Sequence, residues 1–195
     1  RTSPSHPFTY VRGLLQSADI AFCNLEAVVS DAGLRPHSLH SLAMRGAPHS
    51  VHGLTDAGLS VVSLANNHCL DHGAAALCET VAALERAGVT PVGVPAPLDG
   101  HQKLVIASVH AVAVGFLAYN LVSNNQFLVH QRISRLLREV AAARRFVDVL
   151  IVSLHWGDEY VWLPSQGQVD LAHRLADEGV TIVLGHHPHV LQPVE

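Results

Sequence analysis

The stretch VVSLANNHCLDHG, residues 61–73, decides how the rest of the chain is interpreted. It begins with five small and apolar residues, which predict a buried strand, and passes directly into Asn66, Asn67 and His68. Asp71 follows three residues after the imidazole. We therefore expect a rigid strand that presents two amides and an imidazole at its carboxyl end.

Three other apolar runs are followed by polar residues in the same way. Open α/β sheets bind ligands beyond the carboxyl ends of their strands, so we expect all four strand ends to converge in space. The three runs are DIAFC (19–23) before Asn24-Leu25-Glu26, VLIVSL (149–154) before His155-Trp156-Gly157, and VTIVLG (180–185) before His186-His187-Pro188-His189.

Segments with helical periodicity alternate with these strands, which predicts an α/β fold with layered βαβ units. No stretch resembles an interdomain linker, so we expect one domain over residues 1–195. Helical spacing is predicted over 8–18, 47–58, 74–87, 130–146 and 168–179, further strands over 61–65 and 89–94, a turn-rich connection over 95–100, and an antiparallel pair of strands over 103–119.

The composition excludes several classes of protein. Hydrophobic residues make up 49% and charged residues 14% of the chain, which is typical of a globular protein. The net charge of -4 and the lack of long basic runs argue against a nucleic-acid-binding protein. The three cysteines lack CxxC spacing, and no apolar run reaches membrane-spanning length. Histidine is unusually frequent, with 15 residues against 12 Lys and Arg together.

The residue types at the strand ends predict a metal site. Imidazole, carboxylate and amide groups form a nitrogen and oxygen ligand set that suits Mn, Fe or Zn. His187 and His189 are separated by one residue, so they can face two neighbouring metal ions. Two divalent ions side by side can bind the attacking and leaving oxygens of a substrate and activate a water molecule.

With these motifs the chain resembles the bacterial capsule-synthesis CapA family, also called the poly-gamma-glutamate synthesis family. This family is a branch of the calcineurin-like metallophosphoesterases. The segments SLANNH, SLHWG and GHHPHVLQP, in this order, carry the resemblance, which extends over nearly the whole chain. It implies a layered, calcineurin-like α/β fold with two metal ions.

The resemblance also implies a role for each residue at the strand ends. His68 would be the general acid that protonates the leaving group, and Asn66 stands in the glycine place of the superfamily's Gly-Asn-His motif. From spacing alone we infer that Asp71 orients the imidazole of His68. The implied metal ligands are Glu26, which bridges the metals, Asn67 through its amide oxygen, His155 and His187 on one metal, and His189 on the other.

Two departures from the family pattern concern the ends of the chain. The family begins with a strand carrying Gly-Asp, whose aspartate binds a metal, and nothing before residues 19–23 supplies it. The family also continues into a further strand after the position of Glu195. We therefore expect residues 1–195 to be an internal fragment of the metallophosphatase-like domain.

Two functions remain open. The first is a dinuclear metal-dependent hydrolase in which a metal-activated water attacks a phosphoester or related bond and His68 acts as acid. The second is a non-hydrolytic, metal-dependent component of envelope polymer assembly or export that binds poly-gamma-glutamate or another anionic polymer. The resemblance implies a membrane-associated or extracytoplasmic place in the bacterial cell envelope, with a membrane-associated polymer synthesis complex as a candidate partner.

Overall fold

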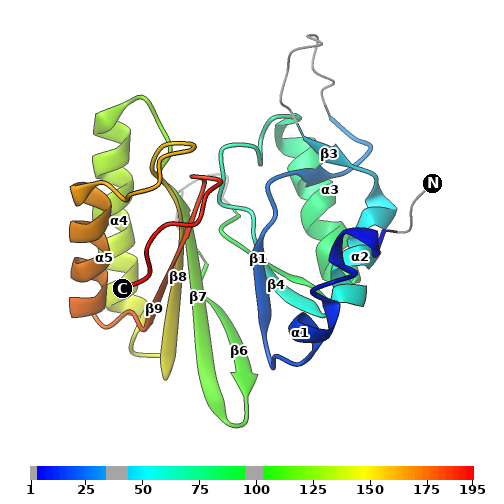
Figure 1. The fold of residues 1–195 in the computed structure, drawn as a ribbon, viewed down its shortest axis with the longest axis horizontal. Coiled ribbons are helices and arrows are strands. Elements are labelled where there is room, and N and C mark those ends of the chain that lie inside the picture. Colours follow the sequence, from blue (N-terminus) through cyan, green and yellow to red (C-terminus); the bar gives the residue numbers. More distant parts are fainter. Residues whose placement is uncertain (1–3, 34–43, 95–102) are drawn as a thin grey trace. The chain divides into compact units, whose positions relative to one another are not determined.

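Short apolar strands followed by helices build both parts of the chain. The structure is a computed structural model that describes residues 4–33, 44–94 and 103–195. The chain forms two compact units, the first spanning Arg1–Pro91 and the second Val92–Glu195. Each unit has its own strands and its own helices (Figure 1), and two short strands of the first unit pair in a second, two-stranded sheet.

The first unit is built around a small sheet in which β1 (Ala21–Asn24) and β4 (Leu59–Ser63) are parallel neighbours. The carboxyl ends of these two strands meet, because Asn24 lies opposite Ser63. On the other side of β4 lies β5 (Thr90–Val92). The remaining elements are the paired short strands β2 (Val28–Val29) and β3 (Arg45–Gly46), the 3-10 helices η1 (His6–Phe8) and η2 (Pro48–Ser50), and the helices α1 (Arg12–Gln16), α2 (Val51–Ala57) and α3 (Gly73–Arg86).

Helix α3 packs on β2 through a face of small and apolar residues. These residues recur at the three- to four-residue spacing of an amphipathic helix. One of them, Thr80, also accepts a hydrogen bond of 2.9 Å from the amide of Val29. Gly88 follows the helix in the left-handed conformation (φ 78°), as Gly58 (φ 90°) does after α2, and this conformation ends a helix. The buried residues of α3 are Ala76, Leu77, Thr80, Ala83 and Leu84.

A carboxylate on α3 binds the chain that leaves β2. Glu79 accepts hydrogen bonds from the hydroxyl of Ser30 and from the amides of Asp31 (3.1 Å) and Ala32 (3.0 Å). The Ser30 hydroxyl and these amides stabilise the charged form and lower the pKa of Glu79 below its usual value. The ionised carboxylate therefore holds residues 30–32 against the helix.

In the second unit the sheet begins with an antiparallel hairpin of β6 (Val105–Val109) and β7 (Val112–Asn120). The two residues between the strands, His110 and Ala111, both have positive φ angles, 48° and 68°. A two-residue turn with positive φ at both positions matches the right-handed twist of the paired strands.

The rest of this sheet is parallel. β8 (Val149–His155) pairs with β7 on one side and with β9 (Ile182–His186) on the other. The register places His155 between Asn120 and His186 at the carboxyl ends of the three strands. Polar residues of three strands therefore share one edge of the sheet.

Two helices cover this sheet, α4 (Gln126–Ala143) against β7 and α5 (Gln166–Asp177) against β9 (Figure 1). The side chain of Asn125 caps α4, and Ser165 with Gln168 forms a reciprocal capping box at the start of α5. No helix of the described residues is long and apolar enough to cross a membrane. The buried core of this unit contains Leu117, Tyr119, Leu121, Leu136, Val140, Ala143, Leu150, Val152, Leu154, Leu171, Leu175 and Val180.

The predicted α/β class and the antiparallel pair of strands are confirmed. Helix α4 begins four residues before the predicted position 130, because the cap Asn125 starts it. Only Arg12–Gln16 is α-helical within the predicted 8–18, and β4 ends at Ser63, two residues earlier than predicted. The predicted connection over 95–100 lies outside the described residues. One domain over residues 1–195, as an internal fragment, stays a prediction.

The contacts of Glu79 predict how the stability of the protein depends on pH. Folding lowers the pKa of Glu79, so the ionised carboxylate contributes to the free energy of unfolding. This contribution is complete when the pH is above the usual pKa of 4.5, and it is lost as the pH falls through the lower pKa of the folded state. Glu79→Gln should remove this part of the acid dependence of the free energy of unfolding, measured by urea titrations from neutral pH down to acid pH. Ser30→Ala, which deletes one donor, should shift the acid transition only part of the way. Identical pH profiles for Glu79→Gln and the parent protein would contradict this assignment.

Candidate functional site

In the first unit, the parallel pairing of β1 and β4 brings two of the predicted strand ends together. The amide of Leu25, just beyond β1, donates a hydrogen bond of 2.9 Å to the carbonyl of Ser63 at the end of β4. The pairing thus continues one residue past β1, and the chain then presents Glu26. The residues after β4 lead to Asn66, Asn67 and His68.

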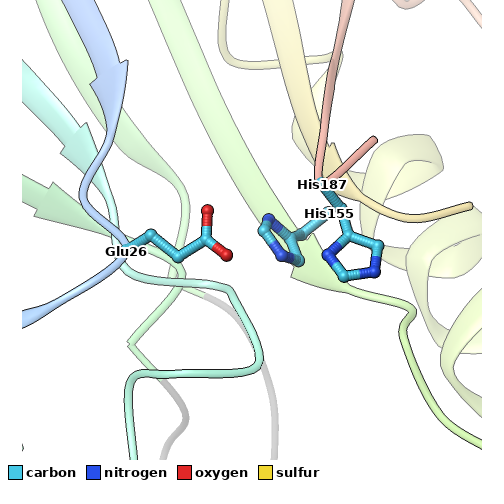
Figure 2. Close-up of side chains that lie close together, drawn as sticks. All are labelled: Glu26, His155 and His187. Carbon is cyan, nitrogen blue, oxygen red and sulfur yellow. The ribbon is translucent and has the colours of Figure 1, made fainter. Parts of the chain in front are cut away.

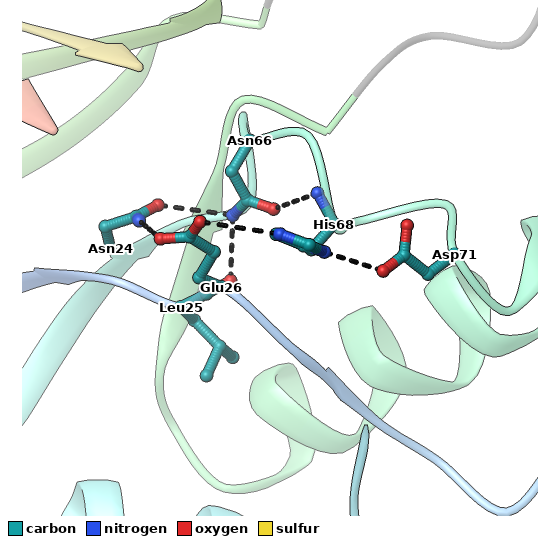
Figure 3. Close-up of polar contacts among 6 residues, drawn as sticks. All are labelled: Asn24, Leu25, Glu26, Asn66, His68 and Asp71. Carbon is teal, nitrogen blue, oxygen red and sulfur yellow. Dashed lines mark hydrogen bonds and ion pairs between the residues drawn. The ribbon is translucent and has the colours of Figure 1, made fainter. Parts of the chain in front are cut away.

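The side chain of Asn66 joins these two strand ends. It is buried, with 1% of its surface exposed. Its amide nitrogen donates to the carbonyl of Leu25 (2.9 Å) and to Oδ1 of Asn24 (3.2 Å), and its oxygen accepts from the backbone amide of His68 (3.1 Å). Figure 3 shows this amide between the three residues. Asn66 therefore holds the backbone at Leu25, directly before Glu26, and the backbone at His68.

Three ionisable side chains lie in a row at this point (Figure 3). Nδ1 of His68 contacts Oδ2 of Asp71 at 2.7 Å, and Nε2 of the same ring lies 3.9 Å from Oε1 of Glu26. The other oxygen of Glu26 accepts a hydrogen bond of 3.0 Å from the side chain of Asn24. The ring of His68 is thus fixed at Nδ1 and presents Nε2 next to a carboxylate.

Asn67 differs from its neighbour, because its side chain is exposed while that of Asn66 is buried. The two adjacent residues therefore differ in their surroundings, with Asn66 inside the fold and Asn67 at its surface.

The cysteines near these strands are not suited to the chemistry of the site. Burial raises the pKa of Cys23 to about 11 and also raises the pKa of Cys69. Both thiols are therefore protonated at neutral pH, whereas the thiolate is the form that attacks substrates and binds metals.

In the second unit, the predicted histidines lie at the end of β8 and just beyond β9. His155 is the last residue of β8 and is 1% exposed. The ring of His187, one residue beyond β9, lies next to that of His155 (Figure 2), and the two ring centroids are 4.8 Å apart. The ring of His189 lies 6.0 Å from that of His187. The parallel register of the two strands thus gathers three imidazoles.

The chain around these histidines adopts an uncommon backbone conformation. His187 (φ 100°), His189 (φ 54°) and Tyr160 (φ 61°) all have positive φ angles, which are sparsely populated by residues other than glycine. The amide of Tyr160 donates a hydrogen bond of 2.7 Å to the carbonyl of Pro188, so the loops after β8 and β9 hold each other. Conformations of this kind concentrate at functional sites.

The second unit also contains donors in an arrangement that fits a metal ion. Ligand atoms of Glu159, His187 and His189 all lie within 4.8 Å of one another. Nδ1 of His187 is buried and has no hydrogen-bond partner among the described residues. A buried nitrogen without a partner is costly, and a metal ion would satisfy it. The residues present therefore fit a divalent ion.

The structure thus gathers the predicted site residues in two sets. Glu26, His68 and Asp71 lie together in the first unit, with Asn67 beside them, and His155, His187 and His189 lie together in the second. The convergence of all four strand ends stays a prediction. Sequence reasoning missed Glu159, although it lies in the segment WGDEY directly after His155.

A comparison with protein families identifies the chain. The model of the family described as "Bacterial capsule synthesis protein PGA_cap" matches residues 1–195. The chain belongs to this family. The capsule-synthesis family predicted from SLANNH, SLHWG and GHHPHVLQP is therefore confirmed.

Bacterial proteins whose names refer to capsule, PGA or polyglutamine synthesis are similar along most of the chain. The "PGA biosynthesis protein CapA" of Bacillus subtilis (strain 168) is 28% identical over 96% of this chain and 52% of its own length. The "Capsule biosynthesis protein CapA" of Bacillus anthracis is 28% identical over 98% of this chain and 50% of its own length. A "Probable polyglutamine synthesis accessory protein" of Mycobacterium tuberculosis is 32% identical over 92% of this chain and 52% of its own length. The chain spans about half the length of these relatives.

A solved structure supports the fold. A hypothetical protein from Thermus thermophilus is similar with a TM-score of 0.59 and 22% identity, covering 96% of this chain and 63% of that protein. At this identity the likeness concerns the fold alone. It agrees with the layered α/β fold that the family membership implies.

The two neighbouring asparagines should differ in their effect on stability. Asn66→Ala leaves the carbonyl of Leu25 and the amide of His68 without their buried partner, and should lower the free energy of unfolding by about 1–3 kcal/mol. Asn67→Ala is the matched control and should cost less than about 0.5 kcal/mol, as expected for an exposed side chain. Urea unfolding of both variants tests this. Equal losses would show that Asn66 does not hold the strand ends.

Proposed function

We propose that the chain is the metal-binding region of a hydrolase that acts in bacterial capsule synthesis. The observation that carries this proposal is the position of His68, whose ring is held by Asp71 at 2.7 Å and presents its other nitrogen 3.9 Å from Glu26. A fixed imidazole next to a carboxylate is an arrangement suited to proton transfer. Membership of the capsule synthesis family supports the biological setting.

The proposed cofactor is a pair of divalent metal ions, Mn, Fe or Zn, because the available donors are imidazole nitrogens and carboxylate or amide oxygens. The buried Nδ1 of His187 and the gathered donors around it support this part of the proposal. When bound, such a pair supplies an activated water and stabilises negative charge on the substrate. The proposed ligands are Glu26 and Asn67 of the first unit and His155, His187 and His189 of the second.

The proposed task of His68 is that of general acid. In its protonated form both ring nitrogens carry hydrogen, so Nδ1 donates to Asp71 and Nε2 holds the proton that passes to the leaving group. Asp71 keeps the ring in this orientation through its contact with Nδ1. Asn66 fixes the backbone of the same residue, so the imidazole is preorganised before substrate arrives.

The proposed substrate is a phosphoester or a related bond, and the proposed setting is the synthesis of an anionic polymer such as poly-gamma-glutamate in the bacterial envelope. Names of the relatives, which refer to capsule and PGA biosynthesis, support this setting. A membrane-associated polymer synthesis complex is the proposed partner.

A second candidate function is non-hydrolytic handling of the polymer. The relative of Mycobacterium tuberculosis is named an accessory protein, which favours a component that binds the polymer and leaves it intact. The metal-loaded protein should be tested with phosphoesters and glutamyl amides. Turnover supports the hydrolase, whereas tight binding of poly-gamma-glutamate with uniform inactivity supports the accessory role.

Three single variants separate the acid from the metal ligands. His187→Ala and Asn67→Ala should lower both the metal content and the rate, because each removes a proposed ligand. His68→Ala should keep its metal and lose about 10²–10⁴-fold in rate, the usual contribution of general acid catalysis. That loss should shrink for substrates with good leaving groups, which need no proton. Elemental analysis of the purified variants, together with their rates on aryl phosphoesters, measures both quantities.

The control for these measurements is His130→Ala, which changes an exposed histidine on α4 that hydrogen-bonds to the carbonyl of Gln126. It should leave the metal content and the rate unchanged. Loss of metal in His68→Ala equal to that in His187→Ala would contradict the assignment of the acid. Full metal content in His187→Ala would contradict the assignment of the ligand.

A further inference from the structure

The loop that follows β8 contains a carboxylate that the proposed ligand set does not include. Glu159 lies four residues after His155, and its carboxylate is grouped with ligand atoms of His187 and His189, all within 4.8 Å of one another. Its neighbour Asp158 is also exposed but does not belong to this group. Of these two adjacent acidic residues, only Glu159 is grouped with the two imidazoles.

Backbone contacts hold this loop against the histidine-bearing segment. The amide of Tyr160 donates to the carbonyl of Pro188 at 2.7 Å, and the side chain of Gln192 donates to the carbonyl of Val161 at 2.8 Å. The ring of Tyr160 lies 6.1 Å from that of His189. These contacts fix the chain immediately after Glu159, so its place beside the two imidazoles is set by the backbone.

The distances match what a metal ion requires after a small side-chain adjustment. Nitrogen and oxygen ligands bind Zn²⁺ at about 2.0–2.2 Å, which places the donors of a tetrahedral site about 3.4 Å apart. The donors of Glu159, His187 and His189, within 4.8 Å of one another, already lie close to this spacing. One carboxylate with two imidazoles is also a ligand set of known zinc enzymes. The buried Nδ1 of His187 is an independent sign of a ligand, since it has no hydrogen-bond partner among the described residues.

We propose that Glu159 is a third protein ligand, together with His187 and His189, of one divalent transition-metal ion. This inference rests on the proposed metal-binding function, adds a residue to it, and places His187 and His189 on the same ion, whereas the family resemblance places them on two. The carboxylate would supply the negative charge that two neutral imidazoles lack. Its exposure leaves room at the ion for water or an anionic substrate group.

The experiment compares Glu159→Gln with Asp158→Asn, since both substitutions remove one negative charge from the same loop. The proteins are stripped with a chelator, and Zn²⁺ alone is titrated in by calorimetry, without substrate. Glu159→Gln should weaken the affinity for Zn²⁺ by at least about 10- to 100-fold, the loss known for residues that only support a ligand. Asp158→Asn should bind as the parent protein does. Glu159→Asp, which keeps a carboxylate, should recover part of the affinity.

A spectroscopic measurement adds a quantity that the loss of one negative charge alone would not change. With Co²⁺ in place of zinc, the visible absorption band reports the number and geometry of ligands, so it should change in Glu159→Gln and stay the same in Asp158→Asn. Circular dichroism confirms that each variant is folded.

The outcomes separate this inference from the function on which it rests. A parent protein that binds neither Zn²⁺ nor Co²⁺ overturns both proposals. A parent protein that binds metal, with equal affinity and spectrum in Glu159→Gln, overturns only the role of Glu159. Equal weakening in Glu159→Gln and Asp158→Asn also overturns it, because the effect would then be one of charge and not of ligation.

Discussion

The side-chain amide of Asn66 is the contact on which the first unit's polar site depends. Its nitrogen binds the carbonyl of Leu25 and its oxygen binds the amide of His68, so one buried group fixes both strand ends. A buried amide has four hydrogen-bonding positions, and here three are used at 2.9–3.2 Å. An apolar residue of similar size would fill the space but leave these groups unpaired. The chemistry of Glu26 and His68 therefore begins with a residue that need touch neither substrate nor metal.

In the second unit, the register of the parallel strands brings the polar residues at the strand ends together. β8 and β9 are parallel, with His155 opposite His186, so the residues that follow β9 come to lie beside the end of β8. Burial lowers the pKa of His186, which favours its neutral form within the fold. The ring of His187 then lies next to that of His155. Parallel pairing thus gathers imidazoles that are about thirty residues apart in the sequence.

Much of this arrangement could be predicted from the sequence, because short local patterns of residues specify it. Apolar runs of five or six residues define the strands, and the polar residues after them, from Glu26 to His189, stand where parallel strands end. The antiparallel hairpin was predictable because no helix separates its two apolar halves.

What could not be predicted depends on contacts between distant segments. The role of Asn66 arises from partners at Asn24 and Leu25, more than forty positions earlier, and no local pattern specifies them. Glu159 resembles any exposed acidic residue until its loop is placed against His187 and His189. The start of α4 is a different case, because its cap Asn125 is a local signal that the sequence contains, five positions before the predicted start of the helix.

The conformation of the histidine segment shows why these two loops must act as a pair. Positive φ angles at His187, His189 and Tyr160 each cost on the order of 1–3 kcal/mol in residues other than glycine. Such angles persist only when surrounding contacts determine them. Here the segment after β9 is anchored to the loop after β8, through the hydrogen bond between Tyr160 and Pro188 and another from the amide of Trp156 to the carbonyl of His186 at 3.0 Å. Since the anchors lie on the backbone, the spacing of the imidazoles is set before any ligand binds. A change that freed either loop would relax both, and the donors would lose their common position even with every donor residue still present.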